Sequence, residues 1–148
     1  MIFPRRSYAC SIKNNNYGEV TMKLNHIALY VRDLEAAKLF FLHYFDAVSN
    51  EKYYNQRTGF QSYFLTFADG GRLEIMTKPG LGDCNPAEEQ MGFTHVAFSV
   101  GSKEKVDELT EQLHNDGFRI ISGPRTTGDG YYESCVEGPE GNRIEITI

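Results

Sequence analysis

One histidine and one glutamate recur at matching places in the two halves of this 148-residue chain. His26 precedes Glu74 by 48 positions, and His95 precedes Glu145 by 50. A solvated strand face explains one such glutamate, and a structural role explains one such histidine, but neither explains their recurrence as a pair. Two imidazoles and two carboxylates suit a divalent transition metal and leave two positions open on a six-coordinate ion. The four residues therefore predict a metal site that is open for catalysis.

The segments that contain these residues also repeat. LNHIALYV, residues 24–31, is answered by FTHVAFSV, residues 93–100; GRLEIM, residues 71–76, is answered by NRIEIT, residues 142–147. In each segment aliphatic residues alternate with other residue types, which is the period-two pattern of a strand with one face on a core. The alternation predicts that each histidine and glutamate lies on the non-aliphatic face of its strand.

Each half also predicts one helix and further strands. Asp33 and Ser102 are suitable N-caps, apolar residues follow both at helical spacing, and Gly117 is a stop signal for the second helix. The predicted order in each half is strand, helix and three strands. The predicted ranges are strand 24–31, helix 33–45 and strands 48–54, 60–67 and 72–77, then strand 93–100, a helix from Ser102 to Gly117, and strands 118–121, 131–137 and 143–148.

The repeat divides the chain into two modules within one domain. The first module covers residues 22–77 and the second residues 92–148, joined by a linker, residues 78–91, that is rich in turn formers and acids. The chain length fits a single domain with its own core. Residues 1–21 lie outside the repeat, and we expect them to be a dispensable, non-native leader before a start at Met22.

Composition excludes several classes of function. A net charge of -5 without a basic stripe argues against a nucleic-acid partner. No apolar run is long enough to span a membrane, and the N-terminus lacks the apolar core of a signal peptide, so a cytoplasmic protein is expected. The odd cysteine count without a Cys-x-x-Cys pair fits a reducing compartment, and we expect packing roles for Cys10, Cys84 and Cys135.

Other polar residues are weaker candidates for the site. His43 and His114 fall in the predicted helices, and neither is a ligand candidate. Arg72 and Arg143 stand two residues before the glutamates on the same strand face. They either pair with a substrate carboxylate or hold the glutamates in place, and the sequence leaves both roles open.

The segment after the second helix has two interpretations. Residues 122–130, SGPRTTGDG, suit either a lid over the site or an ordinary hairpin connection. Tyr131 and Tyr132 follow it, and strand alternation allows only one of them to face a cavity.

These motifs resemble the vicinal oxygen chelate superfamily, which contains glyoxalase I, fosfomycin-resistance proteins, methylmalonyl-CoA epimerase, bleomycin-resistance proteins and extradiol dioxygenases. The resemblance covers residues 22–148 and rests on HIALYVRDLEAAKLFF, GGRLEIM, GFTHVAFSV and EGPEGNRIEI. It implies an α+β fold in which paired βαβββ modules form a curled mixed sheet, a cup around a divalent metal.

The order His26, Glu74, His95, Glu145 resembles bacterial glyoxalase I, the lactoylglutathione lyase of methylglyoxal detoxification. This resemblance implies a lyase that isomerises the hemithioacetal of a 2-oxoaldehyde and a thiol to a 2-hydroxyacyl thioester through an enediolate. It implies nickel or zinc as the metal, with cobalt, manganese or iron as alternatives, and glutathione or another thiol in the small-molecule substrate. It also implies that Glu145 is the catalytic base and that Glu74 assists it. It further implies a homodimer in which each metal site combines one module from each of the two subunits.

Two alternatives from the same superfamily remain open. One is another metal-dependent reaction, either thiol addition to an epoxide antibiotic or an epimerisation. The other is a non-catalytic protein that sequesters an antibiotic or another small molecule in the cup. A complete set of four metal-ligating residues favours an enzyme, because a sequestering pocket does not need it. Metal analysis separates the binding protein from the enzymes, and assay of methylglyoxal with a panel of thiols separates the enzymes from each other.

Overall fold

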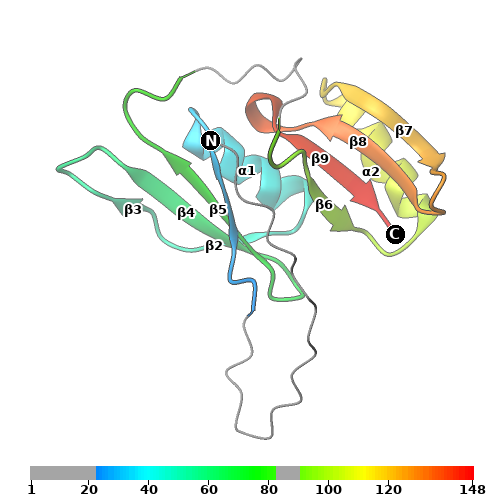
Figure 1. Cartoon of the computed structure of the whole chain (residues 1–148), viewed down its shortest axis with the longest axis horizontal. Coiled ribbons are helices and arrows are strands. Elements are labelled where there is room, and N and C mark those ends of the chain that lie inside the picture. The colour runs from blue at the N-terminus through cyan, green and yellow to red at the C-terminus, as the bar shows by residue number, and fades with distance from the viewer. Residues whose placement is uncertain (1–22, 83–90) are drawn as a thin grey trace, which may run out of the picture.

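The computed structural model describes residues 23–82 and 91–148, which form two modules with the same order of elements (Figure 1). The predicted leader, residues 1–21, and the predicted start at Met22 lie outside the described residues. Among the residues that are described, no helix is long and apolar enough to cross a membrane.

The first module is a mixed sheet with one helix. Its strand order is β1-β5-β4-β2, with β3 also paired to β4; β1 runs parallel to β5, and the other pairs are antiparallel. The elements are β1 (Ile27–Tyr30), α1 (Leu34–Tyr44), β2 (Val48–Ser49), β3 (Tyr53–Tyr54), β4 (Gln61–Thr66) and β5 (Arg72–Thr77).

The second module repeats this arrangement. Its strand order is β6-β9-β8-β7, and again the first strand lies parallel to the last one. The elements are β6 (Val96–Ser99), α2 (Lys103–Asn115), β7 (Ile120–Thr126), β8 (Tyr132–Glu137), a short 3-10 helix η1 (Pro139–Gly141) and β9 (Arg143–Thr147). The predicted α+β fold of paired βαβββ modules is confirmed.

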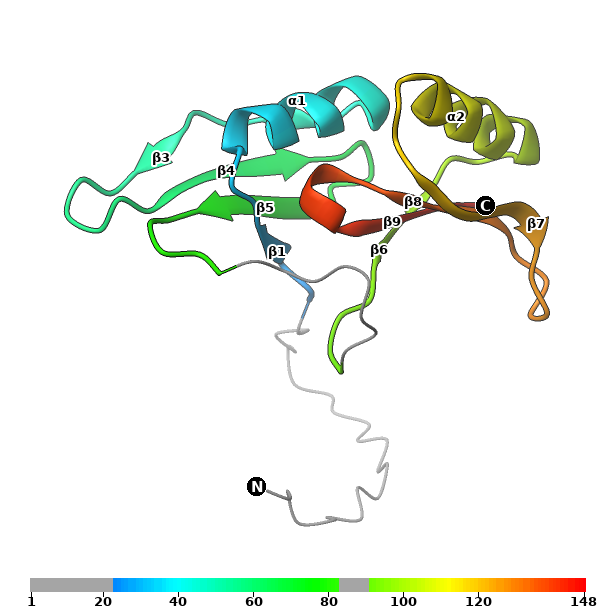
Figure 2. The same ribbon diagram turned by 90° about the horizontal axis from the view of Figure 1, so that it is seen from above.

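Both helices cover the same side of the two sheets (Figure 2). Alternate residues of β5 and β9 supply the centre of the core on that side, and Leu73, Ile75, Ile144 and Ile146 are at most 2% exposed. Because neighbouring strand residues point to opposite faces, the residues between them lie on the face away from the helices. We call this second face of the sheets the cup face.

The helix ends follow the sequence signals. The Asp33 carboxylate accepts a hydrogen bond from the Ala36 N–H at 2.9 Å, and the Ser102 hydroxyl accepts one from the Lys105 N–H at 3.3 Å. After α2, Gly117 adopts a positive φ of 92°, which glycine accommodates without a Cβ clash. Both predicted N-caps and the predicted stop are confirmed.

Contacts between the modules fix one against the other. The Glu140 carboxylate of η1 accepts hydrogen bonds from the backbone N–H groups of Arg32 and Asp33, just before α1. At the other end of α1, the Tyr44 hydroxyl donates to Asp116 at 2.7 Å. The aromatic rings of helix α1 also pack against Phe98 and Phe118 of the second module.

Several predicted strands differ from the structure. The first strand of each module begins later than predicted, so His26 and His95 lie directly before β1 and β6 rather than inside them. The predicted strand 48–54 is divided into β2 and β3, because the Asn50 side chain accepts the Phe64 N–H and interrupts the regular ladder.

A further difference concerns residues 122–130. The predicted strand 118–121 instead runs from 120 to 126, and its pairing with β8 contains two register shifts. Pro124 is accommodated because β7 is an edge strand. The turn that follows is closed by a hydrogen bond from the Thr127 N–H to the Tyr131 carbonyl. The paired part of this segment therefore forms the edge strand of a hairpin.

Candidate metal centre

The first histidine and glutamate meet at the start of β1 and β5. Ala28 is the register partner of Glu74, so both side chains lie on the cup face. His26 lies two residues before Ala28, and its side chain therefore projects toward the same face. The His26 Nε2 and Glu74 Oε2 atoms are 3.7 Å apart. Their side chains are 35% and 15% exposed, so the pair is accessible yet partly shielded from water.

The second module builds the same pair. Ala97 is the register partner of Glu145, and His95 lies two residues before Ala97. The His95 Nε2 and Glu145 Oε2 atoms are 3.3 Å apart, and the side chains are 40% and 19% exposed. Each module therefore presents one imidazole nitrogen beside one carboxylate oxygen on the cup face.

The geometry of each pair fits two adjacent ligands of one divalent ion. Atoms bound about 2.1 Å from an ion lie about 3.0 Å apart in octahedral and about 3.4 Å apart in tetrahedral coordination. The separation of 3.3 Å lies within this range, and that of 3.7 Å lies slightly above it. The nitrogen and oxygen donors also match the chemistry of nickel and zinc.

One chain does not bring the two pairs together. Within residues 23–82 and 91–148, no group of three or more histidine, cysteine, aspartate or glutamate side chains could hold a metal ion. A His2Glu2 site therefore requires either a second chain or a rearrangement of the two modules. We call the His26–Glu74 pair the N-terminal half-site and the His95–Glu145 pair the C-terminal half-site.

Different side chains surround the two half-sites. Phe64 is the register partner of Glu74, and the His26 ring meets the Phe64 ring edge to face at 5.2 Å. Cys135 is the register partner of Glu145. Burial raises the pKa of the Cys135 thiol, so the thiol remains protonated and behaves as a small packing group at neutral pH. This agrees with the packing role expected for that cysteine; Cys10 and Cys84 lie outside the described residues.

The two arginines whose roles the sequence left open have different surroundings in the structure. The Arg72 guanidinium lies over the Phe64 ring at 4.1 Å and donates to Asn25 Oδ1 at 3.5 Å. Among the described residues, the ion-pair partner of Glu74 is His26 rather than Arg72. Arg143 lies on β9 opposite Glu137 in the register.

The remaining sequence candidates lie away from the half-sites. The Tyr132 hydroxyl donates to Asp107 of α2 at 2.7 Å, which places this ring on the helix side of the sheet, and Tyr131 is 54% exposed at the hairpin. His43 lies on α1 within 3.4 Å of the Gln112 amide. His114 lies in the last turn of α2.

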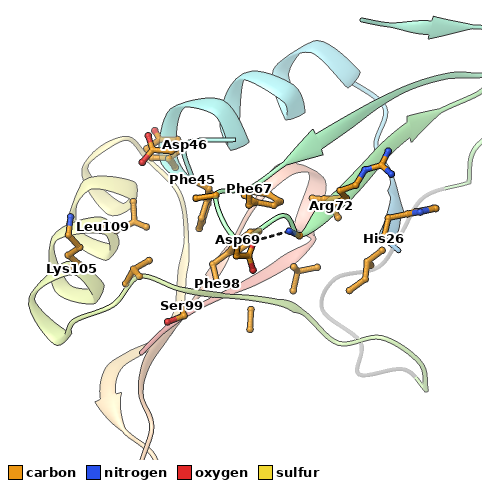
Figure 3. A pocket seen from close by; sticks show the side chains of 18 of the residues that line it. His26, Phe45, Asp46, Phe67, Asp69, Arg72, Phe98, Ser99, Lys105 and Leu109 are labelled. Atoms are coloured by element: carbon orange, nitrogen blue, oxygen red, sulfur yellow. Dashed lines mark hydrogen bonds between the residues drawn. The ribbon is translucent and has the colours of Figure 1, made fainter. Parts of the chain in front are cut away.

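A cavity of about 760 Å³ lies between the modules and reaches the N-terminal half-site (Figure 3). Phe45, Phe67 and Phe98 form its apolar centre, whereas His26 and Arg72 lie at one side. A cavity of this size can hold a small organic molecule.

Two residues beside the histidines were missed by the sequence reasoning. Asn25 Oδ1 lies 2.8 Å from His26 Nδ1, and Thr94 Oγ1 lies 3.1 Å from His95 Nδ1. The available signal was their position, since a hydrogen-bonding side chain directly precedes the histidine in both modules.

Comparison with known proteins agrees with the fold and the motifs. The model of the Glyoxalase/Bleomycin resistance protein/Dioxygenase superfamily matches residues 23–146. The chain therefore belongs to this superfamily. An uncharacterised protein of Bacillus subtilis, YqjT, is 28% identical over 130 residues, which cover 83% of this chain and 96% of that protein.

Solved structures of bacterial proteins share this fold. A possible glyoxalase from Bacillus cereus is 27% identical with a TM-score of 0.65, covering 86% of this chain and all of that one. A variant of the fosfomycin resistance protein FosX from Listeria monocytogenes is 23% identical with a TM-score of 0.66, covering 86% of this chain and 92% of that one. The latter structure contains Mn(II) and 1S,2S-dihydroxypropylphosphonic acid, and its likeness to this chain shows the shared fold.

Proposed function

We propose that this protein is a divalent-metal-dependent lyase of the glyoxalase I type, which isomerises the hemithioacetal of a 2-oxoaldehyde and a thiol to a 2-hydroxyacyl thioester. The observation that supports this most directly is the recurrence of one imidazole–carboxylate pair, at adjacent-ligand spacing, on the cup face of both modules. The superfamily relationship and the similarity to a possible glyoxalase add support.

The proposed metal ligands are His26, Glu74, His95 and Glu145, with nickel or zinc as the metal. A divalent ion supplies Lewis-acid stabilisation of the negative charge that develops on the substrate oxygens. Glu145 removes the proton from the carbon that carries sulfur and returns it to the adjacent carbon, and the hydroxyl proton passes from the oxygen of the first carbon to the oxygen of the second, so the isomerisation loses no atom. Glu74 holds the opposite side of the site and assists this transfer.

We further propose that two chains form a homodimer, in which the N-terminal half-site of one subunit faces the C-terminal half-site of the other. The separation of the half-sites in one chain supports this arrangement. Leu24 and Phe93, which precede the two histidines by two residues, are 81% and 97% exposed. Burial of such apolar side chains beside the half-sites favours association.

Elemental analysis followed by an isomerase assay tests the function. We expect one nickel or zinc ion for each pair of half-sites, and turnover of methylglyoxal with a thiol after reconstitution. Glu145→Gln keeps a ligand of similar shape but removes the base, so we expect turnover to fall at least about 100-fold while much of the metal remains. The control is Glu133→Gln, a change on the neighbouring strand β8 that leaves both half-sites intact. Full turnover in Glu145→Gln contradicts the assigned base.

The cavity supports a second candidate function, the sequestration of a small molecule. Its apolar centre of Phe45, Phe67 and Phe98 suits an aromatic or aliphatic ligand that undergoes no reaction. A protein of this kind does not require the metal. Tight binding of an apolar ligand by metal-free protein, together with no metal uptake, favours this second function over the lyase.

A further inference from the structure

The side chain directly before each histidine contacts the ring nitrogen that faces away from the glutamate. Asn25 Oδ1 lies 2.8 Å from His26 Nδ1, whereas His26 Nε2 is the nitrogen beside Glu74. A neutral imidazole carries one proton, so a donor role for Nδ1 leaves Nε2 with the lone pair that a metal requires. If the Asn25 amide presents its oxygen at this contact, His26 Nδ1 carries the proton and Nε2 keeps its lone pair for a metal. If the amide presents its nitrogen, the reverse tautomer is favoured.

Arg72 determines which atom of the Asn25 amide faces His26. The Arg72 Nη1 atom lies 3.5 Å from the same Asn25 atom, and a guanidinium can only donate hydrogen bonds. The amide group that faces both residues must accept, so it is the oxygen, and His26 Nδ1 must carry the proton. The Phe64 ring supports this arrangement, because it contacts both the Arg72 guanidinium and the His26 ring.

The C-terminal half-site lacks this constraint. Thr94 Oγ1 lies 3.1 Å from His95 Nδ1, but a hydroxyl can either donate or accept. Contact with Thr94 therefore allows both neutral tautomers of His95. The two half-sites have the same ligand types but differ in how firmly the histidine is prepared for the metal.

We infer that Asn25 is a positioning residue that holds His26 in its Nδ1–H tautomer, with Nε2 directed at Glu74, so that the N-terminal half-site is preorganised for metal. This inference rests on the proposed function, because it assigns the metal to these half-sites. Removing such a partner of a ligating histidine typically weakens metal binding about 10- to 100-fold.

Two-bond ¹H–¹⁵N spectra of the metal-free protein report the tautomer directly, and the loss of signals in His26→Gln assigns those of His26. We expect His26 in the wild type to be the Nδ1–H tautomer. Asn25→Leu removes the acceptor and should produce a mixture, whereas Asn25→Asp retains an acceptor and should restore the Nδ1–H form. The matched control Thr94→Val should leave the His26 signals unchanged.

Calorimetric titration with nickel and with zinc provides the second readout. We expect Asn25→Leu to bind about 10- to 100-fold more weakly than wild type, with Asn25→Asp close to wild type. An Nε2–H tautomer in the wild type, or unchanged tautomer and affinity in Asn25→Leu, overturns the inference. A wild-type protein that binds neither metal overturns the proposed function instead, and the tautomer spectra still decide whether Asn25 orients His26.

Discussion

Glu35 is the residue at the centre of a charged cluster on the helix side of the first module. Lys38 donates to its carboxylate at 2.6 Å, and Lys52 and the Tyr63 hydroxyl donate to it as well. The hydrogen bond from Lys38, then those from Lys52 and Tyr63, lower the pKa of Glu35 to about 2. The cluster ties α1 to β4 and to the segment between β2 and β3.

The lowered pKa predicts how this cluster depends on pH. A depressed carboxylate pKa contributes stability above the unfolded value of about 4.3, and that contribution is lost as pH falls toward 2. Because the Glu35 side chain is 47% exposed, we expect Glu35→Gln to cost only about 0.5 to 1 kcal/mol at pH 7. Urea denaturation at pH 7 and pH 2.5 measures the difference between wild type and variant, which should be clearly smaller at the lower pH.

The control for this prediction is Glu111→Gln, on the exposed side of α2. It should change stability less than Glu35→Gln at pH 7. A Glu35→Gln effect of equal size at both pH values contradicts the assigned pKa.

At this scale the sequence could indicate the metal-ligating pairs but not their surroundings. His26, Glu74, His95 and Glu145 were accessible to prediction because recurrence with the same spacing is visible in the chain, although their assignment as ligands stays a prediction. The contacts of Asn25 with its neighbours depend on side-chain rotamers and on a strand pairing far along the chain, and alternation does not encode either.

Among the elements, α2 and β8 are joined by a buried pair of hydroxyls. Thr110 donates to the Val106 carbonyl at 2.6 Å, so its oxygen must accept the hydrogen bond from Ser134, also 2.6 Å away. Thr110 and Ser134 are 4% and 0% exposed. The only hydroxyl proton of each group is thus used inside the core.

This pair predicts a strong dependence of one residue on the other. Thr110→Val keeps the shape of the side chain but leaves the Ser134 hydroxyl buried without its acceptor, so we expect a loss of about 1 to 3 kcal/mol in the free energy of unfolding. The double variant Thr110→Val/Ser134→Ala removes both hydroxyls and should recover part of that loss. Denaturant unfolding of the wild type, both single variants and the double variant gives the coupling energy. Additive effects would show that the hydroxyls do not depend on each other.

The sequence predicted the type and order of the elements better than their ends. Residues before Ile27 continue the alternating pattern, yet the pairing of β1 with β5 begins only at Ile27 and Leu73, one residue after β5 itself begins. Likewise, the pairing of β6 with β9 begins at Val96 and Ile144, one residue after β9 begins. The pattern of a single strand cannot reveal where its pairing with a neighbour begins, whereas helix ends were predicted well because their caps are local.

For the whole molecule, the distribution of ligands over two chains can be tested by mixing variants. One variant carries His26→Ala/Glu74→Gln and lacks an N-terminal half-site; the other carries His95→Ala/Glu145→Gln and lacks a C-terminal one. Neither homodimer has an intact site, but the heterodimer of the proposed arrangement has one. Random exchange of equal amounts should therefore restore about a quarter of wild-type metal binding and turnover.

The control for this experiment is each variant alone, refolded and incubated under the same conditions. No recovery in a mixture that native mass spectrometry shows to contain heterodimers would contradict a site shared between subunits.

The buried hydroxyl pair also bears on the history of the duplicated halves. Thr110 and Phe41 lie at the same distance from the N-caps of their helices, so they occupy equivalent positions in α2 and α1. Ser134 of β8 and Tyr63 of β4 are equivalent as well, because each is the register partner of the same position in the last strand of its half. One half places two aromatic rings at these positions, and the other places two small polar groups there. Exchanging either helix between halves would therefore leave a void or force an overlap. The two copies have diverged into parts that cannot replace each other, even though their cup faces each still present one histidine beside one glutamate.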